Sequence, residues 1–453
     1  MDFSVLREND IRGVYGEGIN EELAYLVGSA FGTYLSTKNK KECVVGYDNR
    51  LSGEKLVEKV MKGLVDTGIN VKFVGMVTTP ILNYATIHFN IESGIMVTAS
   101  HNPSNENGFK IFGDNFLHLK REELEKFYEL IKNKQFVVGI GKIEYIDITN
   151  SYINMLSTYI NSGKRKLKVA IDPGNGTTSL FIREIIKHFN IEPIYLNIKS
   201  DGSFPVHNPD PNVEENLKGL KETIIKEKCD FGLAFDGDGD RVGVVDELGN
   251  TIECDKLIAI YARDIIPKTL NKKVMLDVKC SKALVEDIER IGATPIMVKN
   301  GSAFIETELS EKDVLVGGEY SGHVFFRDKY YGYDDGIYAG LRLFEILTNS
   351  NKNCSELLND YNKYFNTPEI KVKTTDEKKW TIVDKVKEYV KSKDYNFIDI
   401  DGVRVTFNDG WALIRCSNTG PNITMRFEAT NELRLEEIKN EFSNLVNELN
   451  SVN

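Results

Sequence analysis

Three aspartates alternate with glycines in the segment of the chain with the strongest chemical character. The segment FDGDGDRVGVVDELG covers residues 235–249 and contains Asp236, Asp238 and Asp240. A tight loop with this alternation can fold three carboxylates around one hard cation, because glycine permits the backbone angles that such a loop requires. Without a cation, three aligned carboxylates would repel one another. The spacing therefore predicts a magnesium site whose protein ligands are these three aspartates.

Two other interpretations fit parts of the same segment. In a calcium loop of the EF-hand type, Glu247 would be the last ligand, but Arg241 stands where that loop needs an invariant glycine and the flanking residues are typical of strands. The second alternative is a solvated acidic turn. Arg241 offers a guanidinium fork that suits phosphate oxygens, and its alternative role is a salt bridge to the acidic loop.

A serine and a histidine follow an apolar strand in the segment GIMVTASHNPSNENGFKIF, residues 94–112. The hydroxyl of Ser100 is a weak nucleophile unless a neighbouring group activates it. His101 and Lys110 are near enough in sequence to act as general base or acid. A turn that caps the next helix would explain the same residues. A metal-bound phosphoserine, however, needs what this segment and the aspartate loop supply together, so Ser100 is the candidate nucleophile.

Two further segments could recognise a polar substrate. In GGEYSGH (317–323), Glu319 and Ser321 could hydrogen-bond vicinal hydroxyls, and the alternative is a strand-end turn with an exposed His323. In RCSNTGPNITMRF (415–427), Arg415 and Arg426 flank backbone N–H groups and hydroxyls that could form an anion nest, and the alternative is a plain hairpin loop. A third segment, IDPGNGTTS (171–179), resembles half of a dinucleotide-binding fingerprint, but Ser179 occupies the third glycine position. We expect an ordinary strand-to-helix turn there and no NAD.

The elements that carry these segments form a unit that occurs three times. Each unit begins with a short apolar strand that ends in Asp, at 44–48, 169–172 and 274–277. A helical pattern, a second strand and, later, a third strand follow in each case. Strands that alternate with helices indicate mixed or parallel sheets covered by helices, and ligands gather beyond the carboxyl ends of such strands. Because the third strands end at Ser100, Asp236 and Glu319, we expect three α/β domains to direct three loops toward one cleft.

The remainder of the chain differs from these units. Residues 395–429 alternate apolar and polar side chains around an Asn-Asp-Gly turn, and an amphipathic helical pattern follows. We therefore predict three similar mixed-sheet α/β domains and a smaller C-terminal α+β domain. The expected boundaries are 1–148, 149–250, 251–366 and 367–453, with residues 366–380 as the last linker.

Composition excludes several classes of function. Of the 453 residues, 41% are hydrophobic and 28% charged, and no apolar run or N-terminal pattern indicates a membrane span or a signal peptide. The net charge of −11 disfavours nucleic acid or an anionic membrane as partner. The six scattered cysteines predict free thiols. We expect a cytoplasmic protein.

Four segments occur in the order and spacing of one known family: TASHNPSNENGFK, DGDGDR, GEYSGH and RCSNTGPNITMRFEA. With them the chain resembles the α-D-phosphohexomutases, and within this family the bifunctional phosphomannomutase/phosphoglucomutase branch most closely. The resemblance covers essentially the whole chain, including LRENDIRGVYG near the N-terminus and GHVFFRDKYYGYDDGIYAG in the third unit. It implies three α/β domains and a C-terminal domain around a deep cleft.

The resemblance also implies a role for each matching residue. Ser100 matches the active-site phosphoserine, whose oxygen completes the magnesium site of Asp236, Asp238 and Asp240. The matches for the catalytic groups beside it are Arg241, His101 and Lys110. The matches for substrate-binding residues are Arg12, Lys279, Glu319, Tyr320, Ser321, Gly322, His323, Arg415, Ser417, Asn418 and Thr419.

The implied activity is that of an isomerase that interconverts hexose 6-phosphates and hexose 1-phosphates of mannose, glucose or both. It proceeds through a phosphoserine enzyme and a hexose 1,6-bisphosphate that turns over within the cleft. The implied cofactors are Mg²⁺ and glucose 1,6-bisphosphate or mannose 1,6-bisphosphate as activator. The expected partners are hexose phosphates, with a monomer or weak homodimer as the assembly.

The chain departs from the bifunctional branch at three positions. Asn9 stands where that branch has a cleft tyrosine, Ser302 where it has a histidine, and Tyr320 where a methionine is usual. The first two positions bear on the choice between epimeric sugars. A phosphoglucosamine mutase, which typically has glutamine at position 320, is one alternative. A phosphatase and a catalytically silent sugar-phosphate binding protein on the same fold are the others.

Overall fold

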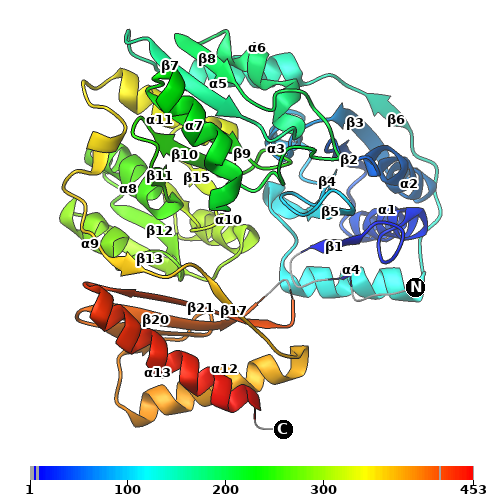
Figure 1. Cartoon of the computed structure of the whole chain (residues 1–453). Coiled ribbons are helices and arrows are strands. Elements are labelled where there is room, and N and C mark those ends of the chain that lie inside the picture. Colours follow the sequence, from blue (N-terminus) through cyan, green and yellow to red (C-terminus); the bar gives the residue numbers. More distant parts are fainter. Residues whose placement is uncertain (1–4, 7–9, 418–419, 452–453) are drawn as a thin grey trace. The chain divides into compact units, whose positions relative to one another are not determined.

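The structure is a computed structural model that describes residues 5–6, 10–417 and 420–451. Asn9, Asn418 and Thr419 therefore lie outside the described residues. The chain forms two compact units (Figure 1). The first unit contains the residues up to Cys254 together with Ser321–Leu357, and the second contains Asp255–Tyr320 together with the residues from Leu358 onward. The division into four domains with the boundaries given above stays a prediction.

The first sheet of the first unit contains the first of the three predicted repeats. Its central strand β2 (Glu42–Tyr47) pairs in parallel with β3 (Asn70–Met76) and β4 (Gly94–Val97). Antiparallel strands β5 (Glu106–Phe112) and β1 (Ile11–Val14) extend one edge, and β6 (Ile143–Tyr145) extends the other. The helices of this region are α1 (Glu21–Thr37), α2 (Gly53–Asp66), α3 (Thr79–His88) and α4 (Arg121–Asn133).

The second sheet of the first unit repeats this arrangement. Strand β7 (Leu167–Asp172) pairs in parallel with β8 (Ile191–Tyr195) and β9 (Phe231–Phe235), and β10 (Val242–Asp246) runs antiparallel to β9 with β11 (Thr251–Ile252) beyond it. The short connection after β7 is a 3-10 turn followed by α6 (Ile182–Ile186). The other helices of this region are α5 (Thr149–Tyr159), α7 (Lys218–Glu227) and α11 (Gly336–Thr348). Strand β15 (Val324–Phe326) precedes α11 in the chain.

The second unit holds the third repeat and the C-terminal region. Strand β12 (Lys273–Asp277) pairs in parallel with β13 (Thr294–Val298) and β14 (Val316–Gly318), with helices α8 (Cys254–Ile265), α9 (Lys282–Arg290) and α10 (Ser302–Glu311). All three repeats thus place the predicted first strand between the second and the third. The predicted mixed α/β architecture is confirmed.

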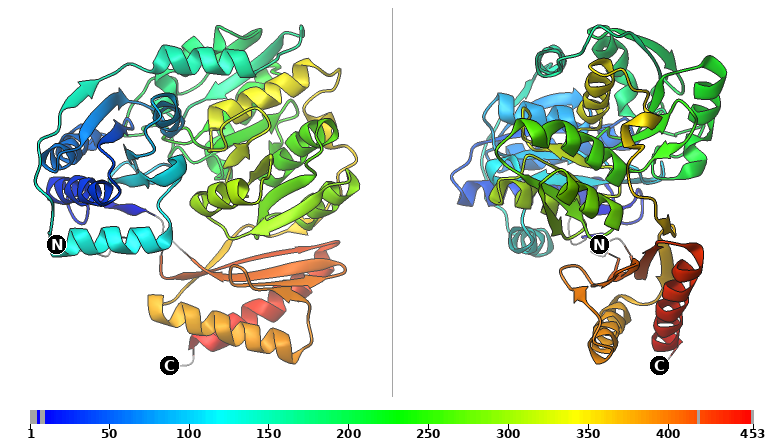
Figure 2. Two further views of the ribbon diagram at one scale, coloured as in Figure 1. Left: turned by 180° about the vertical axis from the view of Figure 1, so that it is seen from behind. Right: turned by 90° about the vertical axis from the view of Figure 1, so that its left-hand side faces the viewer.

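The C-terminal region is an antiparallel sheet with two helices. Its strands are β16 (Phe365–Asn366), β17 (Ile370–Lys373), β18 (Phe397–Ile398), β19 (Val403–Phe407), β20 (Gly410–Cys416) and β21 (Asn422–Ala429). Helices α12 (Asp376–Ser392) and α13 (Glu432–Ser451) lie side by side and pack on this sheet (Figures 1 and 2). The stretch 366–380 was predicted as a linker. It instead contains β17 and the start of α12, because β17 pairs with β21 and Thr375 caps the helix.

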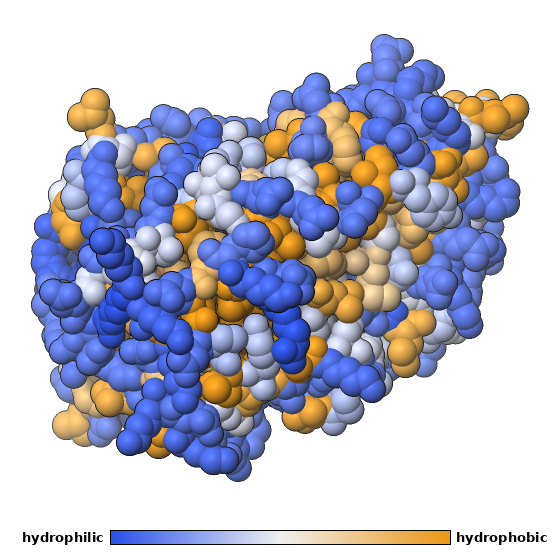
Figure 3. All heavy atoms as spheres, turned by 90° about the horizontal axis from the view of Figure 1, so that it is seen from above, coloured by the Kyte–Doolittle hydropathy of each residue, from blue (hydrophilic) through white to orange (hydrophobic). Residues whose placement is uncertain are grey.

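The polarity of the surface and the state of the cysteines can be compared with what the composition predicts. On the face seen in Figure 3, hydrophilic residues are interspersed among the apolar ones. Among the described residues no helix is long and apolar enough to cross a membrane. All six cysteines are buried and free, as predicted.

Two glycines allow α1 and α2 to pack backbone to backbone. A Cβ atom at Gly28 of α1 would overlap the carbonyl oxygen of Val60 in α2, and one at Gly63 of α2 would overlap that of Tyr25 in α1. The close approach lets the apolar side chains of both helices pack tightly around Phe31 and Leu64, which are fully buried.

We predict that Gly28→Ala destabilises the protein although alanine favours helices. The added methyl group must displace backbone, and overpacking of this kind costs about 1–3 kcal/mol. The matched control is Gly219→Ala near the start of α7, where the nearest atom to a Cβ is 3.9 Å away. This control should leave stability unchanged or raise it by up to about 1 kcal/mol. Urea unfolding of both variants measures the difference, and equal effects would contradict the helix contact.

Candidate functional site

The three aspartates lie in a strand–loop–strand segment. Strand β9 ends at Phe235 and β10 begins at Val242, so the loop lacks the flanking helices of an EF-hand. Gly239 has φ +78°, which an L side chain rarely adopts. Asp236, Asp238 and Asp240 are all buried, and they offer ligand atoms within 4.8 Å of one another. Glu247 accepts hydrogen bonds from Ser355 instead of joining this group.

The charges of the aspartate cluster favour a cation. Burial raises the pKa of Asp236 well above its ordinary value, and repulsion from Asp240 and Asp238 raises it further. One oxygen of Asp238 accepts hydrogen bonds from Thr79 (2.6 Å) and Lys110 (2.8 Å). The other oxygen of Asp238 and Oδ1 of Asp240 are buried and have no hydrogen-bond partner among the described residues. Carboxylate oxygens left open in this way fit a hard divalent cation.

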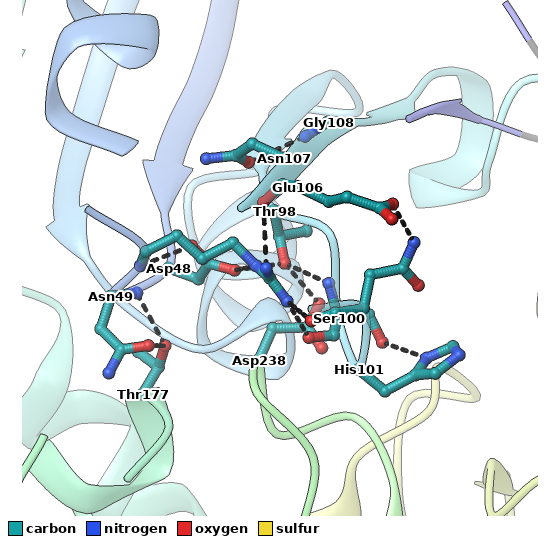
Figure 4. Close-up of polar contacts among 12 residues, drawn as sticks. Asp48, Asn49, Thr98, Ser100, His101, Glu106, Asn107, Gly108, Thr177 and Asp238 are labelled. Carbon is teal, nitrogen blue, oxygen red and sulfur yellow. Dashed lines mark hydrogen bonds and ion pairs between the residues drawn. The ribbon is translucent and has the colours of Figure 1, made fainter. Parts of the chain in front are cut away.

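Ser100 lies against this cluster. It is almost fully buried, and its hydroxyl donates a 2.7 Å hydrogen bond to Asp236 Oδ2. His101 Nδ1 lies 3.2 Å from Ser100 Oγ (Figure 4). Its φ of +50° is in the left-handed region, which costs a residue with a Cβ atom about 1–2 kcal/mol. A strained serine whose hydroxyl contacts a cluster of carboxylates suited to a cation is the arrangement expected of a nucleophile.

The two candidate acid–base groups beside Ser100 differ in charge. Burial lowers the pKa of His101 well below its ordinary value, and Arg241 and Arg12 lower it further. Burial would lower the pKa of Lys110, but Asp238 and Asp240 raise it above its ordinary value. His101 is therefore neutral near pH 7 and able to accept a proton. The two aspartates thus hold Lys110 as an ammonium group, which balances part of their charge.

Arg241 is held by a buried histidine. Its Nε donates a 2.9 Å hydrogen bond to His323 Nε2, and His323 Nδ1 lies 2.7 Å from the carboxylate of Asp334. Because Nε2 accepts, the ring proton is on Nδ1 and faces Asp334. Asp240, His323 and Asp334 also have the spacing of a metal-binding group. The contact of Nδ1 with Asp334 explains the proximity of these two groups without a metal ion, and Asp240 Oδ1 lies farther from Nδ1, at 3.6 Å.

Other predicted residues of the first unit lie around the same loop. Arg12 on β1 contacts Asp10 (2.6 Å) and donates to the side chain of Asn102 (3.1 Å), two residues after Ser100. Gly322 has φ +99°, and the carbonyl of Ser321 accepts a hydrogen bond from Asn212. The first unit thus brings together Ser100, His101, Lys110, Arg241, His323, Arg12 and the three aspartates.

The second unit holds a separate group of predicted residues. Glu319 accepts hydrogen bonds from Asn300 (3.0 Å) and from the backbone of Gly301, one residue before Ser302. The Tyr320 ring centroid lies 3.7 Å from the guanidinium carbon of Arg426.

Two cations of this second group are also buried. Lys279 Nζ lies 3.2 Å from Glu369, and Arg415 Nε lies 2.9 Å from Asp401. Ser417 follows the end of β20, where its N–H donates to the carbonyl of Asn422. Asn418 and Thr419 lie outside the described residues.

Four residues of the Ser100 site were not predicted from the sequence. Thr98 Oγ1 accepts the N–H of Ser100 (2.9 Å) and donates to Asp48 (2.7 Å). Arg50 donates to the carbonyl of Ser100, and Thr79 to Asp238. A signal for Asp48 exists in the sequence, because each repeat's first strand ends in aspartate. We find no such signal for the other three.

The chain matches four family models in order along its length. These describe phosphoglucomutase/phosphomannomutase alpha/beta/alpha domain I (residues 4–138), domain II (145–249) and domain III (253–364), and the C-terminal domain of the same family (369–445).

Individual proteins agree with these matches. A phosphomannomutase/phosphoglucomutase of Pseudomonas aeruginosa is 39% identical over 450 residues, which are 99% of this chain and 96% of that protein. A phosphoglucomutase of Neisseria meningitidis is 37% identical over 448 residues, covering 98% of this chain and 96% of that protein. A solved phosphoglucomutase/phosphomannomutase family protein of Burkholderia thailandensis has a TM-score of 0.93 and 33% identity, with 100% of this chain and 99% of that chain covered. The chain belongs to the phosphoglucomutase/phosphomannomutase family.

Proposed function

We propose that the protein is a phosphohexomutase that interconverts hexose 6-phosphate and hexose 1-phosphate, with mannose and glucose as the sugars. The observation that carries the proposal is the 2.7 Å hydrogen bond from the Ser100 hydroxyl to Asp236 of the three-aspartate cluster. A serine in this position can carry a phosphoryl group whose oxygen lies beside a cation. The names of the relatives in the family support the same reaction.

The transfer proceeds from phosphorylated Ser100 to the free hydroxyl of the hexose phosphate. The bond between phosphorus and Ser100 Oγ breaks and a bond to the sugar oxygen forms, which gives a hexose 1,6-bisphosphate. The sugar hydroxyl loses a proton and Oγ gains one, and His101 Nδ1 is the group placed to hold a proton at Oγ. In the second half-reaction Ser100 takes back the phosphoryl group from the other end of the sugar, so no phosphate is lost.

The charges around Ser100 suit this transfer. We assign Asp236, Asp238 and Asp240 as ligands of Mg²⁺, which supplies positive charge to the phosphoryl oxygens when bound. Arg241, oriented by His323, offers a fixed guanidinium to the same oxygens. Lys110 neutralises part of the aspartate charge and keeps Asp238 oriented.

We assign substrate recognition to a second set of residues. Arg415 and Ser417, with Asn418 and Thr419, would hold the phosphate that does not react, because a guanidinium, hydroxyls and backbone N–H groups are suited to an anion. Glu319, Ser321 and His323 would select the sugar, together with Tyr320 and Gly322. Arg12 and Lys279 would add positive charge for the two phosphates. Hexose 1,6-bisphosphate is then both activator and intermediate.

Replacement of the nucleophile tests the reaction directly. We expect Ser100→Ala to lower kcat/KM for glucose 1-phosphate by at least about 10³-fold, because no other group can carry the phosphoryl group. Ser104→Ala in the same loop is the matched control and should remain within about threefold of wild type. Circular dichroism must show both variants folded. Activity of Ser100→Ala near wild type would contradict the proposal, and release of inorganic phosphate in step with substrate loss would indicate a phosphatase.

Removal of the metal tests the aspartate cluster. We expect chelation with EDTA to abolish turnover and Mg²⁺ to restore it. Asp238→Asn should weaken Mg²⁺ binding at least about tenfold, since a neutral amide replaces a charged ligand. Asp246→Asn, in the same β-hairpin but hydrogen-bonded to the turn after β10, should leave binding unchanged. Isothermal titration calorimetry with Mg²⁺ measures both, and equal affinities of the two variants would remove Asp238 from the site.

Sugar preference can be compared with three substrates under one set of conditions. We expect kcat/KM for mannose 1-phosphate and glucose 1-phosphate to agree within about tenfold, which is 1.4 kcal/mol of transition-state energy. Glucosamine 1-phosphate should react at least about 100-fold more slowly, since Tyr320 lacks the amide typical of that specificity. A strong preference for one hexose would instead make Asn9 and Ser302 the first positions to exchange. Fast turnover of the amino sugar would establish a phosphoglucosamine mutase.

A further inference from the structure

Arg50 lies beneath the Ser100 loop and uses every donor of its guanidinium group. Nη2 donates to the carbonyls of Ser100 and Asn102, both at 2.7 Å. Nη1 donates to the carbonyls of Pro103 (2.6 Å) and Glu106 (2.9 Å). Nε donates to the carboxylate of Asp48 at 3.1 Å. Since a guanidinium has five N–H groups, none is left over.

The guanidinium group that donates these hydrogen bonds is buried inside the first unit. Arg50 is 2% exposed, and Asp48 beneath it is fully buried. Asp48 also accepts the hydroxyl of Thr98, and this hydroxyl in turn accepts the N–H of Ser100 (Figure 4). Both sides of Ser100 are therefore fixed by one network, the N–H through Thr98 and the carbonyl through Arg50.

Four backbone carbonyls of the loop accept hydrogen bonds from the guanidinium group of Arg50, and this restricts the conformations that the loop can adopt. A change in the backbone angles of residues 100–106 would turn at least one carbonyl away and leave a buried guanidinium N–H without a partner, which is costly. Ser100 keeps its unfavourable left-handed φ under this constraint. Strained residues persist only where surrounding contacts over-determine them.

We propose that Arg50 is the positioning residue of the phosphoryl-transfer serine, and that it acts by fixing the backbone of residues 100–106 so that Ser100 Oγ is directed at Asp236. This inference rests on the proposed mutase function and adds to it a residue outside the family motifs quoted above. The side-chain partners of Arg50 are Asp48 and four carbonyls of the loop, and within the described residues none of its hydrogen bonds goes to Asp236, Asp238 or Asp240. The hydrogen bonds through which it would act are therefore bonds to the loop backbone.

The conservative variant Arg50→Lys separates positioning from charge. Lysine keeps the positive charge but has three donors on a single atom, so it cannot reach four divergent carbonyls and Asp48 together. The matched control is Arg342→Lys in α11. Arg342 is equally buried in the same unit and pairs with Asp328 at 2.9 Å and with Glu345 at 3.0 Å.

Two measurements on the full chain test the proposal. In steady-state kinetics with glucose 1-phosphate and glucose 1,6-bisphosphate, we expect Arg50→Lys to lower kcat about 100-fold while KM stays within about threefold, because substrate contacts are intact. In hydrogen exchange, amides of residues 100–107 should exchange at least about tenfold faster than in wild type, with no change in α11. Arg342→Lys should show wild-type kcat and altered exchange only around α11.

The outcomes distinguish this proposal from the function on which it rests. Inactive wild-type protein would overturn the proposed mutase. Active wild-type protein together with an Arg50→Lys variant of unchanged kcat, or with unchanged exchange in residues 100–107, would overturn the positioning role. If Arg50→Lys does not fold, Asp48→Asn replaces it, since it keeps the side-chain volume beneath Arg50. We then expect about a tenfold loss in kcat with the same local exchange, and the absence of either would overturn the proposal.

Discussion

The strongest constraint in the first unit is electrostatic, because three carboxylates are buried in one short loop. An ionised carboxylate loses several kcal/mol of hydration when it is buried, and the members of this cluster also repel one another. Lys110 from β5 pairs with two of them, and Thr79 at the start of α3 donates to Asp238. Open oxygens remain on Asp238 and Asp240. Lys110 and Thr79 thus donate to the loop that follows β9 of the second sheet. A divalent cation could neutralise the negative charge that remains.

The same constraint explains the conformation of Ser100. The chain turns after β4, and Ser100 takes a left-handed φ of +50° in that turn while its hydroxyl donates to Asp236. Gly237 allows the approach from the other side, because a Cβ atom there would lie 2.5 Å from the carbonyl oxygen of Ser100. The left-handed Ser100 and Gly237 of the aspartate loop therefore both contribute to the close approach of the two loops.

The residues that carry the chemistry of the site were easier to predict from the sequence than the residues that hold them in position. The alternation of Asp236, Asp238 and Asp240 indicated a cation site because charge and spacing are local properties. The repeat was also visible, since each first strand ends in aspartate. Arg50 was missed because its partners are backbone carbonyls about fifty residues away. Every residue has such a carbonyl, so the sequence does not indicate which ones accept a hydrogen bond. The strand β17 was missed although its sequence, IKVK, alternates apolar and polar residues as a strand does. The polar residues around it favoured a linker, and its pairing with β21 is not visible in the sequence.

The three strand-end aspartates show how one structural device serves different chemistry. In each repeat, one carboxylate oxygen accepts the N–H two residues later, at 3.0 Å for Asp48, 2.9 Å for Asp172 and 3.2 Å for Asp277. This bond shapes the turn after the first strand in all three repeats. The second oxygen differs, since Asp48 holds Arg50, Asp172 accepts from Asn197, and Asp277 accepts from Asn300. Because the first oxygen fixes the turn, the second oxygen is available for a partner particular to each repeat. In the first repeat that partner is Arg50, which also donates to the carbonyl of Ser100.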